Sequence, residues 1–278
     1  MAFWRKVAIA ASAAACLALP CAIPPAAASS FSTDNSDLWW NSGESGWGMQ
    51  VIQRADIIFV TLYVYNTNKT PIWYAAVLNS NGPTNWTGDL MQTSGPWFGT
   101  QPFNQGEVTV TQVGAMSFTA TSVSTGVLSY SINGVSNTKH IERMTLRYDN
   151  YNGNYVGMLA YAAEGCPNPN DRGLFNNRID FSITQSQSPS GASMSMISQQ
   201  QGATAVCSSS GDYGQDGQFG NTRQVTGSCS DGSGGGAVTT YYQMNVTPSG
   251  IMMNFTAPSS NPGSKGCTLK GTLVGIRQ

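Results

Sequence analysis

The run IIFVTLYVY at residues 57–65 decides the fold, together with the run IWYAAVL at residues 72–78. In the first run the even positions, from Ile58 to Val64, are aliphatic, while most odd positions are aromatic. Alternation with a period of two in β-branched and aromatic residues is typical of β-strands. Both faces of each strand are apolar. We therefore expect one face to form a core and the other to contact another sheet, the second domain or a ligand.

Outward from these runs, short segments rich in Val, Ile, Thr, Tyr and Phe alternate with turn clusters of Asn, Gly, Ser and Pro. A turn spacing of roughly 8 to 12 residues is typical of antiparallel sandwiches and barrels. Strands of the first half are predicted near residues 46–53, 57–66, 71–79, 84–92, 107–113, 115–121, 126–132 and 138–147. Strands of the second half are predicted near residues 154–162, 178–185, 193–199, 203–210, 219–229, 237–247, 250–256 and 266–277.

The predicted fold class is therefore all-β, with two small antiparallel β-barrel or β-sandwich domains after a signal peptide. A Trp-rich domain covers residues 37–147, and a disulfide-stapled domain covers residues 154–278. The pattern of strands and turns fits a closed barrel and a sandwich equally well.

The N-terminus has the parts of a secretion signal. Arg5 and Lys6 precede an apolar run, and small residues follow up to Ala28. This pattern predicts a removable signal peptide at residues 1–28 and a periplasmic or secreted protein. The competing interpretation is a lipid anchor through Cys16, which follows three alanines. We expect no transmembrane segment, because no later run approaches the roughly 20 apolar residues of a spanning helix.

Charge argues against a nucleic-acid partner. Arg5 and Lys6 account for two of the 13 basic residues, which leaves 11 against 14 acidic ones. A phosphate backbone requires a basic patch. The nearest approach to one is Lys139, Arg143 and Arg147, which we interpret as the solvated edge of a strand.

The four cysteines beyond the signal region all lie in the second half of the chain. An even number of cysteines in an exported protein indicates disulfides, and their spacing does not fit a zinc site. Of the three pairings that four cysteines allow, we favour Cys207 with Cys229 and Cys166 with Cys267. The first pair is symmetric about Gln218, as expected across a hairpin, and the second would tie the start of the domain to its last strand.

Trp4 apart, the tryptophans of the chain lie between Trp39 and Trp97, and the densest motif is DLWWNSGESGWGM at residues 37–49. At these residues the chain resembles an uncharacterised family, an exported bacterial β-rich module. That module has a W-W-N-x-x-E-S-G-W-G opening and a P-x-W hairpin, here at Pro71 to Trp73. The resemblance covers residues 37–147 only. It implies a β-rich fold and export, and it supplies no catalytic residue.

Two interpretations of the clustered aromatic residues remain open. In the structural one, Trp47, flanked by Gly46 and Gly48, plugs one end of a barrel. In the functional one, exposed rings form a platform for a glycan or an apolar ligand, with polar neighbours beside them. The candidate ligand-binding residues are Trp39, Trp40, Asn41, Glu44, Trp47, Tyr63, Trp73, Trp86 and Trp97.

The sequence names no catalytic residue, metal ligand or cofactor. His140 is not expected to act as the general base of a serine hydrolase, because the chain contains no G-x-S-x-G elbow that would hold an activated serine. The glycine-rich stretch at residues 211–220 lacks the spacing of known calcium loops and predicts a hairpin loop. A carboxylate pair of the glycosidase type remains conceivable, from Asp37 with Glu44 or from Asp56 with Asp89.

The leading hypothesis is an exported, non-enzymatic protein whose first domain binds a glycan or an apolar small molecule through its clustered aromatic side chains. In this hypothesis the disulfide-stapled second domain is a scaffold or a surface for a partner. The alternative is a protein-interaction component of the cell envelope, in which another polypeptide covers the second apolar face. A hydrolase with an unrecognised carboxylate pair is the third hypothesis.

Overall fold

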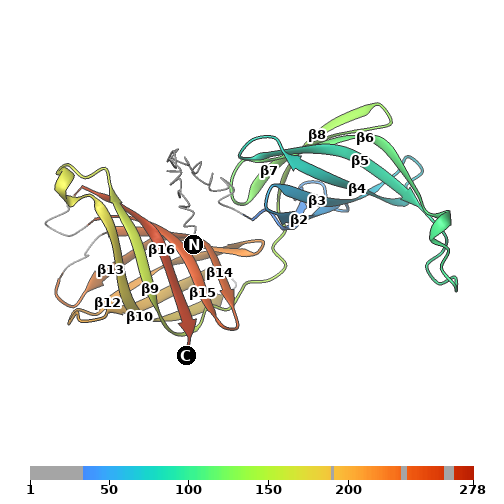
Figure 1. Cartoon of the computed structure of the whole chain (residues 1–278). Coiled ribbons are helices and arrows are strands. Elements are labelled where there is room, and N and C mark those ends of the chain that lie inside the picture. The colour runs from blue at the N-terminus through green and yellow to red at the C-terminus, as the bar shows by residue number, and fades with distance from the viewer. Residues whose placement is uncertain (1–33, 189–190, 233–236, 260–265) are drawn as a thin grey trace, which may run out of the picture. The chain divides into compact units, whose positions relative to one another are not determined.

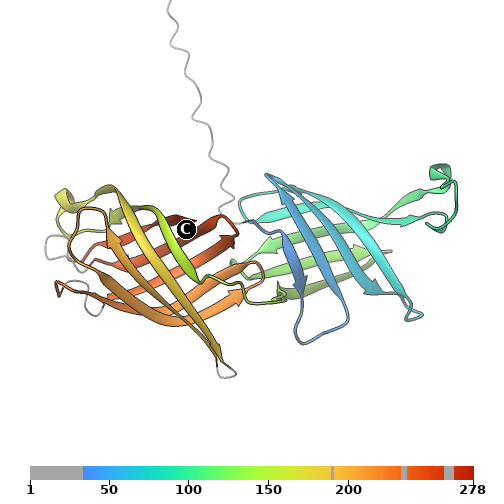
Figure 2. The same cartoon turned by 90° about the horizontal axis from the view of Figure 1, so that it is seen from below.

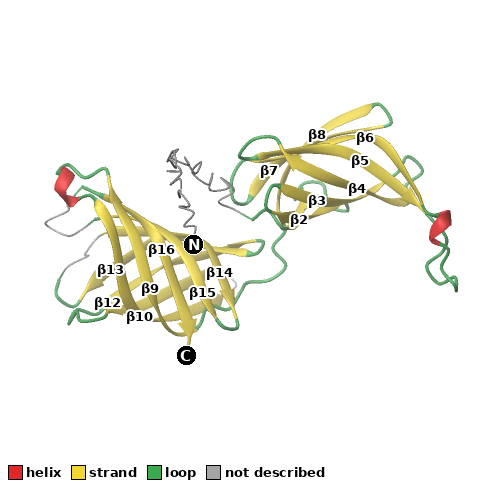
Figure 3. Ribbon diagram, viewed as in Figure 1, coloured by secondary structure: helices red, strands yellow, loops and turns green. Residues whose placement is uncertain are grey.

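The structure is a computed structural model that describes residues 34–188, 191–232, 237–259 and 266–278 (Figure 1). The predicted signal peptide, including Cys16, lies outside these residues. The regular secondary structure of the described chain consists of strands and two short 3-10 turns, η1 (Gln105–Glu107) and η2 (Pro169–Asp171) (Figure 3). No helix in this part of the chain is long and apolar enough to span a bilayer.

Strands β1 to β8 close into an antiparallel barrel, here named barrel 1 (Figures 1 and 2). Each strand pairs with the next along the chain, and β1 pairs with β8 to close the ring. The strands are β1 (Asp37–Trp40), β2 (Gly48–Arg54), β3 (Ile57–Tyr65), β4 (Pro71–Ser80), β5 (Asn85–Ser94), β6 (Thr109–Ala120), β7 (Thr125–Ile132) and β8 (Val135–Arg143).

Strands β9 to β16 close into a second antiparallel barrel, barrel 2, in which β16 pairs with β9. The strands are β9 (Gly153–Glu164), β10 (Gly173–Ser188), β11 (Gly191–Gln200), β12 (Cys207–Asp216), β13 (Phe219–Cys229), β14 (Ala237–Thr247), β15 (Gly250–Pro258) and β16 (Thr268–Arg277). The predicted all-β fold is confirmed, and both domains are barrels rather than sandwiches.

The observed strands differ from the predicted ones at β1 and β6 and in several bounds. The sequence predicted two strands where β6 is continuous, and it missed β1, which is only four residues long. The glycine-rich stretch at residues 211–220 forms the ends of β12 and β13, and its hairpin turns at Gly217 and Gln218. The prediction of a hairpin there is confirmed, although most of its residues belong to the strands and not to a loop.

The two-faced pattern of β3 follows directly from closure of the barrel. Ile58, Val60 and Leu62 point inward and are fully buried. The odd positions point outward, and Phe59 and Tyr63 are 43% and 47% exposed. Because the sheet closes on itself, its aliphatic face forms the core without a second sheet. The second apolar face is exposed in the described structure.

Three rings occupy the interior of barrel 1. Trp39 and Trp86 are each 1% exposed, and Phe118 lies between them with ring-centroid distances of 5.1 and 5.8 Å. Gly126 faces this cluster, and a Cβ at that position would lie 3.0 Å from the Phe118 ring. The large rings therefore fill the space that closure of the sheet creates.

Both predicted disulfides are present. Cys207 on β12 pairs with Cys229, its register partner on β13, and Cys166 pairs with Cys267 across 101 residues. The predicted connectivity is confirmed. Disulfides of this kind are typical of proteins that mature in an oxidising compartment.

Candidate ligand-binding site

A cluster of tyrosines closes one end of barrel 2. Tyr151, from the segment before β9, is fully buried, and its hydroxyl donates to the carbonyl of Met244 at 3.0 Å. The Tyr155 hydroxyl donates to the carbonyl of Tyr151 at 2.8 Å, and the Tyr213 hydroxyl donates to the Gln215 side chain. Burial raises the pKa of Tyr151 and of Tyr213 above the usual value of tyrosine, at which the hydroxyl is already protonated at physiological pH.

The opposite end of barrel 2 is hollow and holds a cavity of about 550 Å³. Inward-facing positions near this end carry small side chains, among them Ala163, Ser198, Gly227 and Ala257. Small residues on several strands leave the interior unfilled, in contrast to the rings that fill barrel 1. The volume is in the range of natural small-molecule pockets, roughly 300 to 1,000 Å³.

Aromatic rings line one side of this cavity. Tyr161 of β9 stacks on Phe175 of β10 with ring centroids 5.1 Å apart. Phe255 of β15 lies 6.5 Å from Tyr161 and 6.2 Å from Tyr241 of β14. All four side chains line the cavity and form one continuous aromatic wall. Such a wall offers a large apolar contact surface whose rings are held by their neighbours.

The other side of the cavity is formed by a flexible methionine and by more polar side chains. Met196, Ser198, Ser209 and the Cys207–Cys229 disulfide line it. Charge is scarce: among the described lining residues only Asp171 and Asp231 are ionisable at neutral pH, and both are acidic. The described lining therefore offers hydroxyls to a ligand but no cation to an anionic group.

Both disulfides lie at the hollow end of the barrel. Cys207 and Cys229 belong to the cavity lining, and Cys166 and Cys267 pack with Ala163 and Leu269, which also line it. In an up-and-down barrel an unfilled end lacks the core contacts that hold strands together. The cross-links therefore stabilise the part of barrel 2 that its core stabilises least.

The structure separates the candidate residues that the sequence selected. Trp39 and Trp86 belong to the core of barrel 1 and have no surface to present to a ligand. Trp40 is half-buried, and Trp47 packs against the core, in keeping with its structural interpretation. Only Tyr63 and Trp73 are neighbours on an exposed surface, as register partners on β3 and β4. Trp97 lies elsewhere, between β5 and β6.

Asn41 and Glu44 have local structural partners. The Asn41 side chain donates to the carbonyl of His140 at 3.0 Å and accepts from the amide of Gly43 at 2.8 Å. Glu44 accepts from Lys139 at 2.6 Å and from the Trp47 indole at 3.0 Å. The hydrogen bond from Lys139 lowers the pKa of Glu44. These contacts order the loop between β1 and β2.

The exposed apolar residues of β2, β3 and β4 form a surface that we name the aromatic face. Register places Ile52, Phe59 and Val77 in one row across the three strands, and Tyr63 with Trp73 in another. The aromatic face comprises Ile52, Ile57, Phe59, Tyr63, Tyr65, Trp73 and Val77, all at least 38% exposed. It is the second apolar face that the sequence predicted.

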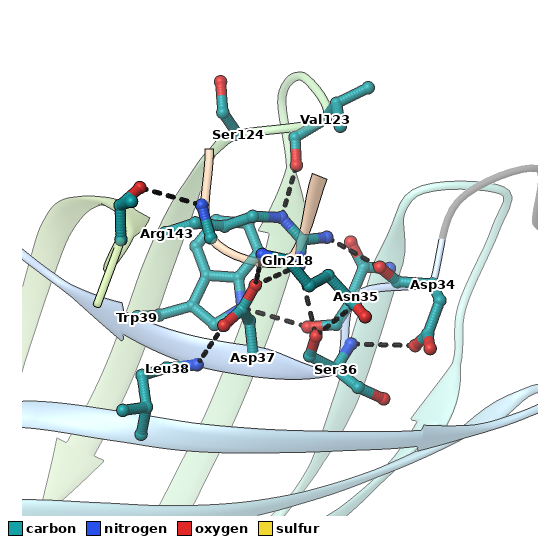
Figure 4. Close-up of polar contacts among 12 residues, drawn as sticks. Asp34, Asn35, Ser36, Asp37, Leu38, Trp39, Val123, Ser124, Arg143 and Gln218 are labelled. Atoms are coloured by element: carbon teal, nitrogen blue, oxygen red, sulfur yellow. Dashed lines mark hydrogen bonds and ion pairs between the residues drawn. The ribbon is translucent and has the colours of Figure 1, made fainter. Parts of the chain in front are cut away.

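Arg143 is not on a solvated edge, which corrects the interpretation of the Lys139, Arg143 and Arg147 group. Its side chain is 0% exposed and donates to Asp37 Oδ2 at 3.0 Å (Figure 4). Gln218 of barrel 2, which shares the compact unit Phe31–Gln278 with these residues, donates its backbone amide to the same oxygen at 2.8 Å. Hydrogen bonds from several segments thus satisfy this buried ion pair.

The proposed carboxylate pair of Asp37 and Glu44 does not share a site, since Asp37 pairs with Arg143 and Glu44 pairs with Lys139. Asp56 and Asp89 show no common partner among the described contacts; Asp56 lies in the turn before β3, and Asp89 lies on β5. His140 is an exposed residue of β8 and pairs with Val127 of β7, whereas the β1–β8 pairing includes only Glu142 and Arg143 of β8. Within the described ranges, no three His, Cys, Asp or Glu side chains gather to hold a metal ion.

Comparison of the chain with protein-family models and with curated proteins finds no match. The resemblance of residues 37–147 to the exported bacterial module therefore stays a prediction, and we infer function from the geometry of the site.

Proposed function

We propose that the protein is a periplasmic or secreted, non-enzymatic binding protein whose barrel 2 holds a small apolar or amphiphilic molecule. The observation that carries this proposal is the cavity of about 550 Å³ with its wall of four aromatic rings. Concave, mostly apolar pockets with a few polar groups are the usual form of small-molecule sites, and barrel mouths are a common place for them.

The cavity lining favours a particular ligand chemistry. The aromatic wall suits a flat or flexible apolar body, and Ser198 and Ser209 provide hydroxyls for a neutral polar group. A carboxylate or sulfate would lose its hydration without gaining a cation from the described lining, and desolvation of an unpaired charge is costly. We therefore propose a neutral ligand, such as an alkyl glycoside or alcohol, in preference to a fatty acid.

Methionine side chains in and beside the cavity lining favour a site that accepts ligands of different shapes. Met194, Met196 and Met253 line a small void that shares Met196, Ser209 and Tyr241 with the lining of the main cavity. Methionine side chains are flexible and polarisable, so they adapt to irregular apolar surfaces. We expect a family of related ligands to bind, with affinities that follow apolar area more closely than exact shape.

The binding site is tested with the neutral dye N-phenyl-1-naphthylamine, whose emission rises in an apolar pocket. Ser198→Phe fills the cavity from β11, and we expect it to weaken dye binding at least about tenfold, equal to about 1.4 kcal/mol. Ile197→Phe adds the same ring at the adjacent position, which is 53% exposed, and is expected to leave binding unchanged. Equal affinity of the two variants would place the dye outside the cavity.

The preferred ligand chemistry is tested by displacement of the dye. Octyl glucoside is expected to compete at least about tenfold better than octanoate at neutral pH, because only the neutral head group avoids an unpaired buried charge. Octanoate competing equally well would contradict the proposed preference for neutral ligands, while leaving the cavity itself as the site.

A second candidate function is favoured by the exposure of Tyr63 and Trp73 on the aromatic face. Adjacent exposed rings on a sheet suit the flat face of a glycan or an envelope protein. The two candidates have separate readouts, because barrel 2 contains no tryptophan. A glycan on the aromatic face is expected to change tryptophan emission, and Trp73→Ala is expected to abolish that change.

A further inference from the structure

The connection between β5 and β6 is a long hairpin, and we name residues 95–108 the hairpin tip. The hairpin tip follows Ser94 of β5 and precedes Thr109 of β6. The side-chain hydroxyls of Ser94 and Thr109 hydrogen-bond to each other at 2.7 Å. The tip, with η1 in it, extends past the ends of the other strands of barrel 1 (Figures 1 and 3). Side chains on it are therefore remote from the core that its neighbours build.

Large aromatic side chains are exposed on this projection. Trp97 and Phe98 are 71% and 81% exposed, and Phe103 is 48% exposed. Val108 and Val110, which flank Thr109 at the start of β6, are 42% and 63% exposed. A single exposed apolar residue is ordinary, but three large rings and two valines exposed along one short hairpin indicate an interaction surface.

The tip is ordered by its own contacts. The Trp97 ring lies over Gly99, where a Cβ would come within 2.4 Å of the indole, and Trp97 and Phe98 have ring centroids 5.8 Å apart. The amide of Thr100 donates to the carbonyl of Trp97 at 2.9 Å. Asn104 accepts from the Gly106 amide at 3.1 Å and donates to Glu107 at 2.8 Å. A defined loop therefore presents the rings outward.

Charge is almost absent from this region. Glu107 is the one charged residue of the hairpin tip, and no lysine or arginine occurs from residue 70 to residue 138. The other polar side chains, such as Thr100, Gln101 and Gln105, are neutral. A partner that matches this surface has an apolar interior and a hydrated, neutral outer layer. It does not depend on charges of opposite sign in the hairpin tip.

We propose that the hairpin tip anchors the protein at the surface of a neutral lipid bilayer, with Trp97, Phe98 and Phe103 in the interfacial layer. Aromatic rings are favoured at that depth, where an apolar body and a hydrated edge are both satisfied. A convex tip enters a fluid layer without a preformed pocket, and residues 95–106, which carry no charged side chain, enter the headgroups without stripping water from an ion. This inference goes beyond the proposed function and does not depend on it.

The test is flotation of the purified protein with phosphatidylcholine vesicles. The protein is expected to float with the vesicles and to do so equally at salt concentrations of about 0.1 M and about 1 M, since no ion pair contributes. The double variant Trp97→Ala/Phe98→Ala is expected to lower vesicle partitioning at least about tenfold. Trp73→Ala is the matched control: it removes another exposed tryptophan from barrel 1 and is expected to leave partitioning unchanged.

A second readout reports the depth of the indole. Brominated phosphatidylcholine is expected to quench part of the tryptophan emission of the unmodified protein. Trp97→Phe is expected to keep the partitioning and lose this quenching. No flotation, flotation only with anionic lipid, or equal losses in the double variant and Trp73→Ala would overturn the proposal. A dimer that dissociates in the double variant, without vesicle binding, would assign the tip to a second copy of the chain instead.

Discussion

Replacement of Arg143 by methionine is expected to destabilise barrel 1 by about 3–5 kcal/mol, the usual cost of removing one partner of a buried ion pair. The guanidinium is fully buried and pairs with Asp37, whose side chain is 14% exposed. It also donates to the carbonyls of Asp34 and Val123, each at 2.6 Å. Methionine fills a similar volume but leaves these acceptors without their donor.

The rings around Arg143 strengthen this expectation. The guanidinium carbon lies 4.8 Å from the Trp39 ring centroid and 5.0 Å from that of Phe219. Burial lowers the pKa of Arg143, while the hydrogen bond and charge of Asp37 act in the opposite direction. An arginine side chain has so high an intrinsic pKa that it stays charged here. The cation is therefore fully desolvated yet held by ring faces and oxygens together.

Urea denaturation followed by tryptophan emission measures this change, because every tryptophan of the described chain lies in barrel 1. Lys139→Met is the matched control, since Lys139 lies on the same strand and pairs with the exposed Glu44. Partly exposed pairs contribute about 0–1 kcal/mol, so only a small shift is expected there. Equal shifts for both variants would mean that the buried network contributes no more than a surface pair.

Arg143 also shows where sequence reasoning fails. Along the chain it is one of three basic residues spaced four apart, which is typical of a solvated surface. Its partners come from Asp34 to Asp37, from Val123 and, through the shared Asp37 oxygen, from Gln218. The closure of β1 onto β8 brings Asp37 beside Arg143, and that pairing joins residues about a hundred positions apart.

The strands themselves were largely predictable because each carries its own period of two. Ile58, Val60 and Leu62 face the core as the alternation indicates, and the Cys207–Cys229 pair follows from hairpin symmetry. The boundary errors have local causes. β1 is too short to show a period, and Gly114 inside β6 suggested a break between strands where the chain continues.

The cavity was not predictable in the same way. An inward-facing Ala163 or Ala257 gives the same alternation as an inward-facing Trp86, so one strand does not tell a filled barrel from a hollow one. The sum of side-chain volumes over eight strands decides it. The usable signal was the contrast between the domains: tryptophans concentrate in barrel 1, whereas barrel 2 has none and carries the disulfides.

The two disulfides are expected to contribute unequally to the stability of barrel 2. Cys166 and Cys267 are 101 residues apart, and Cys207 and Cys229 are 22 apart. Because the loss of unfolded-state entropy grows with the logarithm of loop length, paired Cys→Ala replacements should cost about 4.7 kcal/mol for the first disulfide and about 3 kcal/mol for the second. Denaturation followed at the tyrosine bands in near-ultraviolet circular dichroism measures both.

Tryptophan emission supplies the internal control, because its transition reports barrel 1 and is expected to stay unchanged in both disulfide variants. The position of the cavity predicts that the two disulfides also differ in their effect on dye affinity. Cys207 and Cys229 line the cavity, whereas Cys166 and Cys267 are absent from its lining. Loss of the Cys207–Cys229 disulfide should therefore alter dye affinity directly. Loss of the Cys166–Cys267 disulfide should change dye affinity only by lowering the stability of barrel 2. A larger stability loss without Cys207–Cys229 than without Cys166–Cys267 would contradict the dependence on loop length. A change in dye affinity only on loss of Cys166–Cys267 would contradict the place of Cys207–Cys229 in the cavity lining.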